Sequence, residues 1–361
     1  MNNSVWQFSL EVLPSILWVT ILTFILIVII RAVPHRLLVL STLIVTLFLV
    51  SLGAYVRLAD AGLGCPDWPG CYGKLTPSGA SVAISQAETK SPYGPVTAEK
   101  AWIEMVHRYL ASFVGVLIVA ILAQVILFNR RTRGEIALKK EVFFPSLLLV
   151  AVIFQGLLGK WTVTMLLKPA IVTMHLAGGM IILGLLAHLS GKQLSHVRVG
   201  TKSRMVSGVL SLSLVAVFIQ ILLGGWVSTN YAALVCIDFP TCQGQFLPDT
   251  KFSEGFNVFR DLGEGPGGEP LSAPALTAIQ ITHRYGALIV SVILIYLSQI
   301  LIKDANSRIF GILIVVCLAM QIGLGVINVV YLLPFFAAVA HNTVAGLLLS
   351  ILVMLKSRLL R

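Results

Sequence analysis

The chain has 361 residues, of which 57% are hydrophobic and 11% charged, and its formal net charge is +11. Soluble domains carry about 25% charged residues, so this composition excludes a soluble globular protein and predicts one that is dissolved in lipid. The Lys and Arg residues gather in alternate short connections between apolar runs, and this distribution argues against a surface that binds nucleic acid.

Nine apolar runs follow one another along the chain, each close to the length that a helix needs to cross a bilayer. They occupy residues 12–30, 37–56, 104–128, 143–163, 169–190, 206–228, 277–301, 308–331 and 335–355. The strands of a membrane β-barrel alternate in hydrophobicity, and these runs do not. We therefore expect an all-α polytopic membrane protein.

The basic residues lie after the first, third, fifth, seventh and ninth runs, which the positive-inside rule places in the cytoplasm. The N-terminus up to Glu11 holds no Lys or Arg, so we expect it outside and the C-terminus inside. This segment has neither the basic start of a signal peptide nor the Arg-rich character of a transit peptide, which favours a bacterial inner membrane over a mitochondrial one. Two long connections, 57–102 and 229–276, then face the outside.

Several short motifs occur twice along the chain and indicate an internal repeat. Leu52–Val56 matches Leu223–Val227, Cys65–Cys71 matches Cys236–Cys242, His107–Tyr109 matches His283–Tyr285, and the pair Gln155 and His175 matches Gln321 and His341. Each copy has an even number of runs, so both copies enter the membrane from the same side. We expect two parallel four-helix bundles, 37–190 and 206–355, with an extra transmembrane helix within 1–36.

Four histidines recur between the copies and lie near the outer ends of their helices: His107, His175, His283 and His341. At a rise of 1.5 Å per residue, all four lie on the order of 10 Å below the outer surface. A single buried histidine is most often a hydrogen-bonded core residue, but four at matched positions favour axial ligands of haem iron. Zinc is the alternative metal, although two histidines per copy fall short of its usual four ligands.

The copies differ three residues before the first histidine, where Glu104 in one copy corresponds to Gln280 in the other. The i, i+3 spacing puts Glu104 on the helix face of His107, where a carboxylate suits proton transfer. The alternative is an interfacial acid paired with Lys or Arg. We therefore expect reactive chemistry beside His107 and a resident redox haem in the second copy.

An arginine follows the first histidine of each copy, Arg108 in one and Arg284 in the other. The planar guanidinium suits the carboxylates at a haem edge, so both are candidates for contact with the propionates. The alternative is a side chain that reaches for the membrane interface.

Each outer connection holds two cysteines six residues apart, Cys65 and Cys71 in the first and Cys236 and Cys242 in the second. A disulfide within each loop suits an oxidising compartment. A shared zinc site and, for the first pair, redox-active thiols are the alternatives. The fifth cysteine, Cys317, is expected to be a small core residue.

In combination these motifs resemble the haem A synthase family of bacteria and mitochondria, over about residues 40 to 355. The resemblance is carried by Gly53–Arg57, Gly64–Pro69, Glu104–Arg108, Met174–His175, His283–Arg284 and His341. It implies an eight-helix core, a haem b bound by His283 and His341, and the substrate haem O bound by His107 and His175. It also implies that Glu104 takes part in oxidising one methyl group of haem O to the formyl group of haem A. The extra helix at 12–30 departs from the family pattern.

Two other functions share the four histidines. One is a di-haem membrane cytochrome that transfers electrons, which has no need for the difference between Glu104 and Gln280. The other is a haem transporter or chaperone, for which parallel repeats with outward pockets also serve. Haem O synthase is a plausible neighbour of a haem A synthase, and association of several copies is compatible with the sequence. The electron acceptor and the oxygen source are not specified by any motif.

Overall fold

A computed structural model describes residues 26–90, 94, 96–129, 135–194, 203–265 and 268–359. Most of the predicted first span, 12–30, lies outside the described residues, although residues 26–32 are helical. The basic residues between 130 and 134 and between 195 and 202 also lie outside them.

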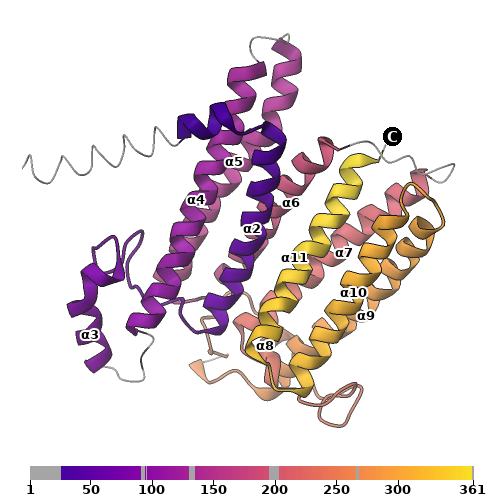
Figure 1. Cartoon of the computed structure of the whole chain (residues 1–361). Helices are drawn as coiled ribbons and strands as arrows, with labels where there is room; N and C mark the ends of the chain where they lie inside the picture. The colour runs from indigo at the N-terminus through magenta and orange to yellow at the C-terminus, as the bar shows by residue number, and fades with distance from the viewer. Residues whose placement is uncertain are drawn as a thin grey trace, which may run out of the picture.

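Eight long helices make up most of the described chain (Figure 1). They are α2 (His35–Leu58), α4 (Ala98–Asn129), α5 (Glu135–Thr164), α6 (Pro169–Lys192), α7 (Ser203–Thr229), α9 (Ala273–Ile302), α10 (Arg308–Val330) and α11 (Phe335–Arg358). All eight are long and apolar enough to cross a membrane, and no strand occurs in the described residues. The predicted all-α polytopic membrane fold is therefore confirmed for the eight spans that the structure describes.

The eight helices pack as two closed rings of four. In the first, α2 and α5 each contact both α4 and α6, and in the second, α9 and α11 each contact both α7 and α10. The rings meet mainly where α6 lies against α11, with further contacts between α2 and α11 and between α6 and α7 (Figure 1). These contacts are compatible with the two predicted units, whose boundaries stay a prediction.

A polar cluster joins the two rings of helices at the ends from which the two long connections start. Arg57, in the last turn of α2, donates hydrogen bonds to the backbone oxygen of Ser228 (2.7 Å) and to the hydroxyl of Tyr231 (3.0 Å). The Tyr231 hydroxyl also lies 2.9 Å from the carboxylate of Asp60. Both pairs, Arg57 with Ser228 and Tyr231 with Asp60, join residues 171 positions apart. The same interval separates the matched cysteines, so the cluster joins positions that correspond in the repeat.

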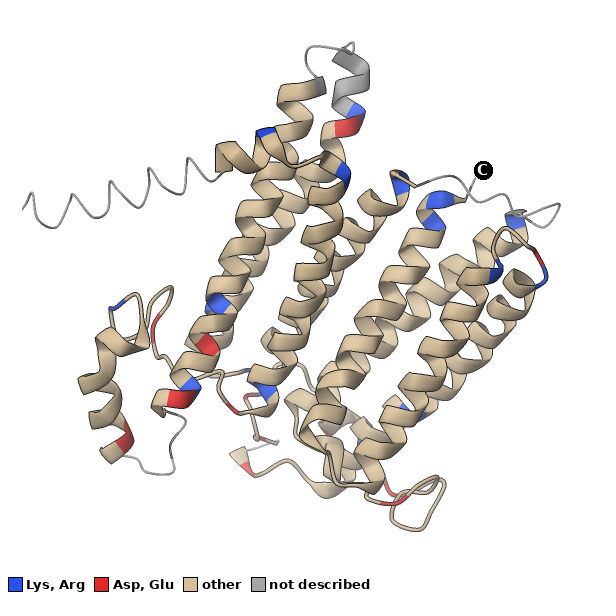
Figure 2. Cartoon of the chain, viewed as in Figure 1, with Lys and Arg blue, Asp and Glu red and all other residues tan. Residues whose placement is uncertain are grey.

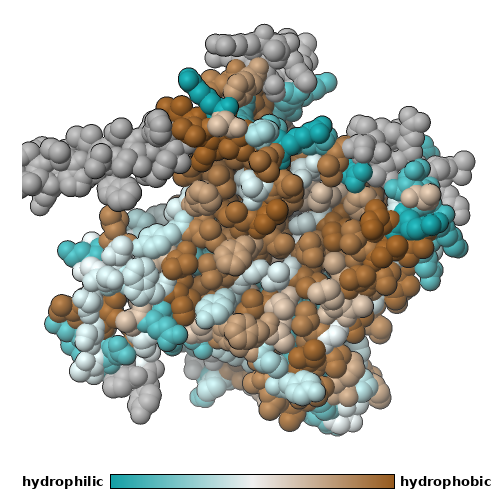
Figure 3. Space-filling model, viewed as in Figure 1, coloured by the Kyte–Doolittle hydropathy of each residue, from teal (hydrophilic) through white to brown (hydrophobic). Residues whose placement is uncertain are grey.

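The outward faces of the helices are apolar, as a lipid environment requires. The side chains of Phe48, Val150 and Val292 are 61%, 63% and 63% exposed, and apolar residues cover the helical part of the visible face (Figure 3). Lys and Arg gather at the helix ends near the C-terminus (Figure 2), including Lys192 on α6 and Lys356 on α11. This distribution agrees with a cytoplasmic C-terminus, which stays a prediction.

The two outer connections contain short helices that the sequence patterns did not predict. The first holds a 3-10 turn, Pro77–Ala80, and α3 (Ser81–Lys90), and the second holds a 3-10 turn, Ala232–Leu234, and α8 (Phe252–Gly255). Ile84 of α3 packs in one buried cluster with the Cys65–Cys71 pair and with Ala101 of α4. The loop helix is therefore anchored to the disulfide through Ile84, a contact that the local sequence does not reveal.

Candidate functional site

The structure brings the four predicted histidines together in two pairs. His107 on α4 and His175 on α6 belong to the first ring, and His283 on α9 and His341 on α11 belong to the second. In each bundle the two histidines lie on helices that stand opposite each other, α4 and α6 in the first and α9 and α11 in the second. Each bundle thus carries two imidazoles on opposite helices.

Each imidazole lies against a glycine of a neighbouring helix. A Cβ atom added to that glycine would lie close to the Cε1 atom of the ring, at 3.3 Å for Gly53 and His107, 3.2 Å for Gly159 and His175, 3.0 Å for Gly224 and His283, and 3.4 Å for Gly325 and His341. Side chains rarely approach other atoms this closely through Cβ, so a residue larger than glycine would push the imidazole ring aside by a few tenths of an ångström. The glycines therefore allow the imidazole rings to pack closely against the neighbouring helices, and they set the position of the Cε1 edge of each ring.

The protein leaves some nitrogens of these imidazole rings without a hydrogen-bond partner. The Nδ1 atoms of His107, His175 and His341 are buried and have no hydrogen-bond partner. Buried polar atoms are normally paired, so the protein itself does not satisfy these three ring nitrogens. Among the residues that the structure describes, no three His, Cys, Asp or Glu side chains come together as a metal-binding group.

This donor set fits haem better than zinc. A porphyrin supplies four nitrogens to its iron and needs only two axial imidazoles, which a facing pair of histidines provides. A structural zinc ion needs about four protein ligands, and neither pair has a third. The two pairs therefore suit two haem groups, each between helices of one bundle.

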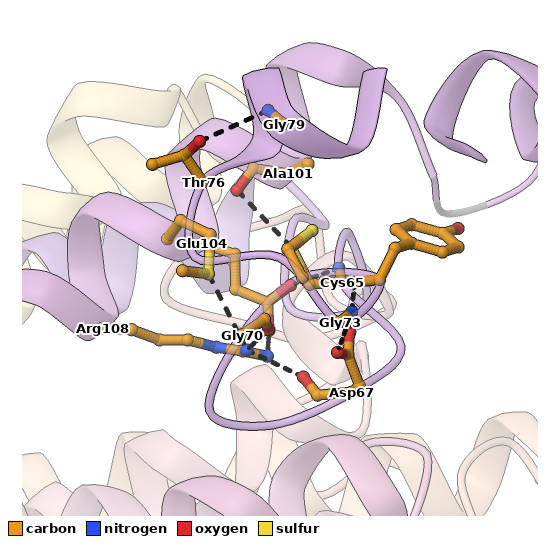
Figure 4. Close-up of a disulfide and its surroundings, with 12 residues drawn as sticks. Cys65, Asp67, Gly70, Gly73, Thr76, Gly79, Ala101, Glu104 and Arg108 are labelled. Carbon is orange, nitrogen blue, oxygen red and sulfur yellow. Dashed lines mark hydrogen bonds and ion pairs between the residues drawn. A yellow bond between two sulfur atoms is a disulfide. The ribbon is translucent and has the colours of Figure 1, made fainter. Parts of the chain in front are cut away.

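Glu104 connects its helix to the first disulfide loop (Figure 4). Its side chain is buried, and its carboxylate accepts hydrogen bonds from the backbone N–H of Cys65 (2.9 Å) and from the guanidinium of Arg108 (2.5 Å). Arg108 donates in addition to the backbone oxygens of Asp67 (2.8 Å) and Gly70 (2.6 Å). The carboxylate is thus an ion-pair partner at the outer end of α4, one turn from His107.

The corresponding place in the second bundle is uncharged. The Gln280 amide donates a long bond of 3.4 Å to the backbone oxygen of Ala233, and its own oxygen is buried without a partner. Arg284 donates to the backbone oxygens of Asp238 (2.9 Å), Thr241 (2.7 Å) and Cys236 (2.7 Å). Both predicted arginines therefore bind loop carbonyls, and their contact with propionates stays a prediction.

The predicted cysteine pairs, Cys65 with Cys71 and Cys236 with Cys242, are joined as disulfides. Beside each disulfide an aspartate closes a turn. Asp67 accepts from the backbone N–H of Tyr72 (2.6 Å) and Gly73 (2.7 Å), and Asp238 accepts from Gln243 (2.7 Å) and Gly244 (2.9 Å). Gly73 and Gly244 have φ of 70° and 75°, in the left-handed region that glycine adopts without strain. The alternative of a shared zinc site is not supported, because all four thiols are joined in disulfides.

Residues 36–353 match the family model described as COX15-CtaA, cytochrome oxidase assembly protein. The chain belongs to this family. It is 39% identical to a heme A synthase of Shewanella oneidensis over 317 residues, which cover 86% of this chain and 92% of the relative. It is 25% identical to a heme A synthase of Rickettsia bellii over 340 residues (87% and 95%), and 26% identical to one of Shouchella clausii over 326 residues (88% and 92%).

For this cytochrome oxidase assembly protein, the predicted resemblance to haem A synthases is confirmed. The sequence patterns nevertheless missed the part played by the glycines and by Gln220, whose amide lies 3.0 Å from Nδ1 of His283. A signal was available, because Gln155, Gln220 and Gln321 each precede one of the four glycines by four residues.

Proposed function

We propose that the chain is a haem A synthase, which oxidises one methyl group of haem O to a formyl group. In this proposal His107 and His175 bind the iron of the substrate, and His283 and His341 hold a resident haem b. The observation that carries the proposal is the pair of histidines on opposite helices of each bundle, with an acid, Glu104, one turn from His107 and the amide of Gln280 at the matched place in the second bundle. The names of the relatives supply the identity of the product.

Two imidazoles from different helices would fix the substrate iron and hence the plane of the porphyrin. Fixing this plane orients the reacting methyl group relative to the helix ends, which is the positional part of catalysis. The disulfide loop is bound to the first turns of α4 through Glu104 and Arg108, so it covers the end of the helix that carries His107.

Conversion of a methyl to a formyl group is a four-electron oxidation that breaks two C–H bonds and adds one oxygen atom. With water as the oxygen source it releases four protons and four electrons, so the site must pass both protons and electrons away from the reacting carbon. Glu104 is an acid of the first bundle that lies one helical turn from a ligand histidine, and its carboxylate is the group that we propose takes up a proton. Haem b, when bound, supplies a one-electron carrier in the adjacent bundle. The electron acceptor beyond it is unassigned.

Pigment analysis tests this function directly. The purified full chain, produced in cells that supply haem O, should yield haem b together with haem A or its hydroxylated precursor on extraction. Haem b alone would identify a di-haem cytochrome, and unchanged haem O with no product would identify a transporter or chaperone. The matched control is His107→Ala, which should yield haem b without haem O or haem A.

A further inference from the structure

A cavity of about 570 Å³ opens along the seam between α7 and α9 of the second bundle. Its lining comes from these two helices and from the second long connection between residues 247 and 252, and no described residue of α10 or α11 contributes to it. The side chains of Ile219 and Ile289 in this lining are 51% and 61% exposed. The cavity therefore lies on the outside of the four-helix ring, where a membrane supplies lipid.

The wall of this cavity is in direct contact with His283. Gln220 lines the cavity, and its Nε2 atom donates to the backbone oxygen of His283 at 2.8 Å and lies 3.0 Å from the ring Nδ1 atom. Thr282, the residue before this histidine, lines the cavity as well. A molecule in the cavity would thus be separated from the proposed haem b ligand by one side chain.

The first bundle carries bulkier or less polar side chains at the places that line this cavity. Positions on α7 and α2 correspond at an interval of 171 and positions on α9 and α4 at 176, the intervals of the matched cysteines and of the first histidines. Bulkier side chains occupy three of these places: Phe48 for Ile219, Leu110 for Gly286 and Phe113 for Ile289. Aliphatic side chains replace two polar ones: Leu49 for Gln220 and Val106 for Thr282. Space and polar groups at this seam therefore distinguish the second bundle from the first.

Three hydroxyl groups lie in the otherwise apolar lining, those of Thr250, Thr282 and Tyr285. Thr282 donates to the backbone oxygen of Ala278 (2.7 Å), and Tyr285 donates to that of Phe246. A hydroxyl group can donate one hydrogen bond and accept others, and no described charged side chain lines the cavity. Such a lining suits an uncharged apolar ring whose oxygens are acceptors in one redox state and donors in the other.

We propose that this cavity binds a membrane quinone, which takes the electrons that leave haem b. The inference rests on the proposed function, whose electron acceptor is unassigned. With water as the oxygen source, conversion of one methyl group releases four electrons and four protons. Two quinones balance this reaction, because each takes two electrons and two protons and becomes a quinol. A lipid-soluble acceptor reaches the seam from the bilayer.

An acyl chain of a membrane phospholipid is the alternative occupant, because it would also fit apolar walls. An acyl chain, however, has no polar atom that could bind the three hydroxyl groups. It would also be accommodated at any apolar seam, so it gives no reason for the difference between the two bundles. The position beside His283 therefore favours the quinone.

The test measures the affinity of the purified full chain with haem b for decylubiquinone and for a short-chain menaquinone, by calorimetric titration. The rate at which either quinone reoxidises reduced haem b without oxygen is a second measurement. Ile289→Phe introduces the side chain of the first bundle, and it should lower the affinity for the bound quinone and the reoxidation rate about tenfold. Leu288→Phe is the matched control, because this exposed neighbour on α9 does not line the cavity. It should leave both values unchanged.

A second variant keeps the shape of the cavity. Thr282→Val removes one hydroxyl group at nearly constant volume, and it should lower the quinone affinity about fivefold while the haem b spectrum is retained. Failure of both quinones to bind, or equal affinity in the wild type, Ile289→Phe and Thr282→Val, would overturn the inference.

Pigment analysis of the same preparations, from cells that supply haem O, separates this inference from the proposed function. Haem A in a chain that binds no quinone would leave the synthase standing and remove the quinone site. Quinone binding that Ile289→Phe weakens, in preparations that contain no haem A or hydroxylated precursor, would leave the site standing and refute the synthase.

Discussion

The carboxylate of Glu104 lies 2.5 Å from the guanidinium of Arg108, one turn further along α4, and both side chains also bind the backbone of the Cys65–Cys71 loop. The acid that distinguishes the two bundles is therefore held at the point where the loop meets the helix that carries His107. One carboxylate thus fixes the disulfide loop to the helix that carries His107, and its proposed part in proton transfer can be tested separately.

Replacing Glu104 with Gln should separate these two roles. The amide retains the shape of the side chain and an acceptor for the Cys65 N–H, so haem binding should persist. Conversion of haem O should fall about a hundredfold or more, because the proton acceptor is lost. Extracted pigments and their rate of appearance measure both quantities. Gln280→Ala, at the matched place, should retain conversion, and normal conversion by Glu104→Gln would remove the catalytic role.

Adding a methyl group at the glycines should impair haem binding in proportion to the crowding of the ring. Gly224→Ala places a Cβ atom 3.0 Å from His283, and Gly325→Ala places one 3.4 Å from His341. We expect haem b affinity to fall about tenfold for Gly224→Ala and less for Gly325→Ala. Gly208→Ala on α7 and Gly323→Ala on α10 are controls, because their Cβ atoms would meet nothing within 4 Å. Equal haem content in all four variants would contradict the proposal that the glycines position the histidine rings.

Removing the first disulfide should loosen the loop without abolishing the reaction. Cys65 and Cys71 are six residues apart, and closing so short a loop contributes about 2 kcal/mol through the entropy of the unfolded chain. The double replacement with Ser should increase hydrogen exchange in this loop and lower conversion only in part, because Glu104 and Arg108 still bind the loop backbone. Complete loss of conversion with unchanged hydrogen exchange would instead favour redox-active thiols.

The turn beside the second disulfide should respond to acid. The hydroxyl of Thr241 (2.6 Å), followed by the backbone N–H groups of Gly244 and Gln243, lowers the pKa of Asp238 from its ordinary 3.8 to about 2. A lowered pKa stabilises the folded turn above pH 3.8, and this contribution is lost as the pH falls through about 2. The difference in hydrogen exchange between the wild type and Asp238→Asn should therefore be large at pH 6 and vanish near pH 2. A difference in hydrogen exchange that does not depend on pH would contradict this role of the Asp238 carboxylate.

Hydrophobicity alone predicted eight spans whose ends agree closely with the structure, because the length of an apolar run is fixed by the bilayer. The predicted run 169–190, for example, corresponds to Pro169–Lys192. The largest displacements are at the starts of α5, which begins at Glu135 rather than near 143, and of α4, which begins at Ala98 rather than near 104. The helix α3 was missed because it depends on packing against the disulfide.

The candidate site was predicted less completely than the spans. Repetition identified the four histidines and the unmatched Glu104, because a repeated polar residue in an apolar run is visible in one sequence. The partners of these residues were not visible in this way. The contacts of Arg108 with loop carbonyls and of Gly224 with His283 join residues distant in the chain, so they depend on how the helices pack.

Pigment analysis of two double variants tests directly whether the two histidine pairs hold different haems. His107→Ala with His175→Ala should retain haem b and contain neither haem O nor haem A. His283→Ala with His341→Ala should lose haem b. Loss of the same pigment from both double variants, or retention of every pigment in both, would contradict the assignment of a different haem to each histidine pair.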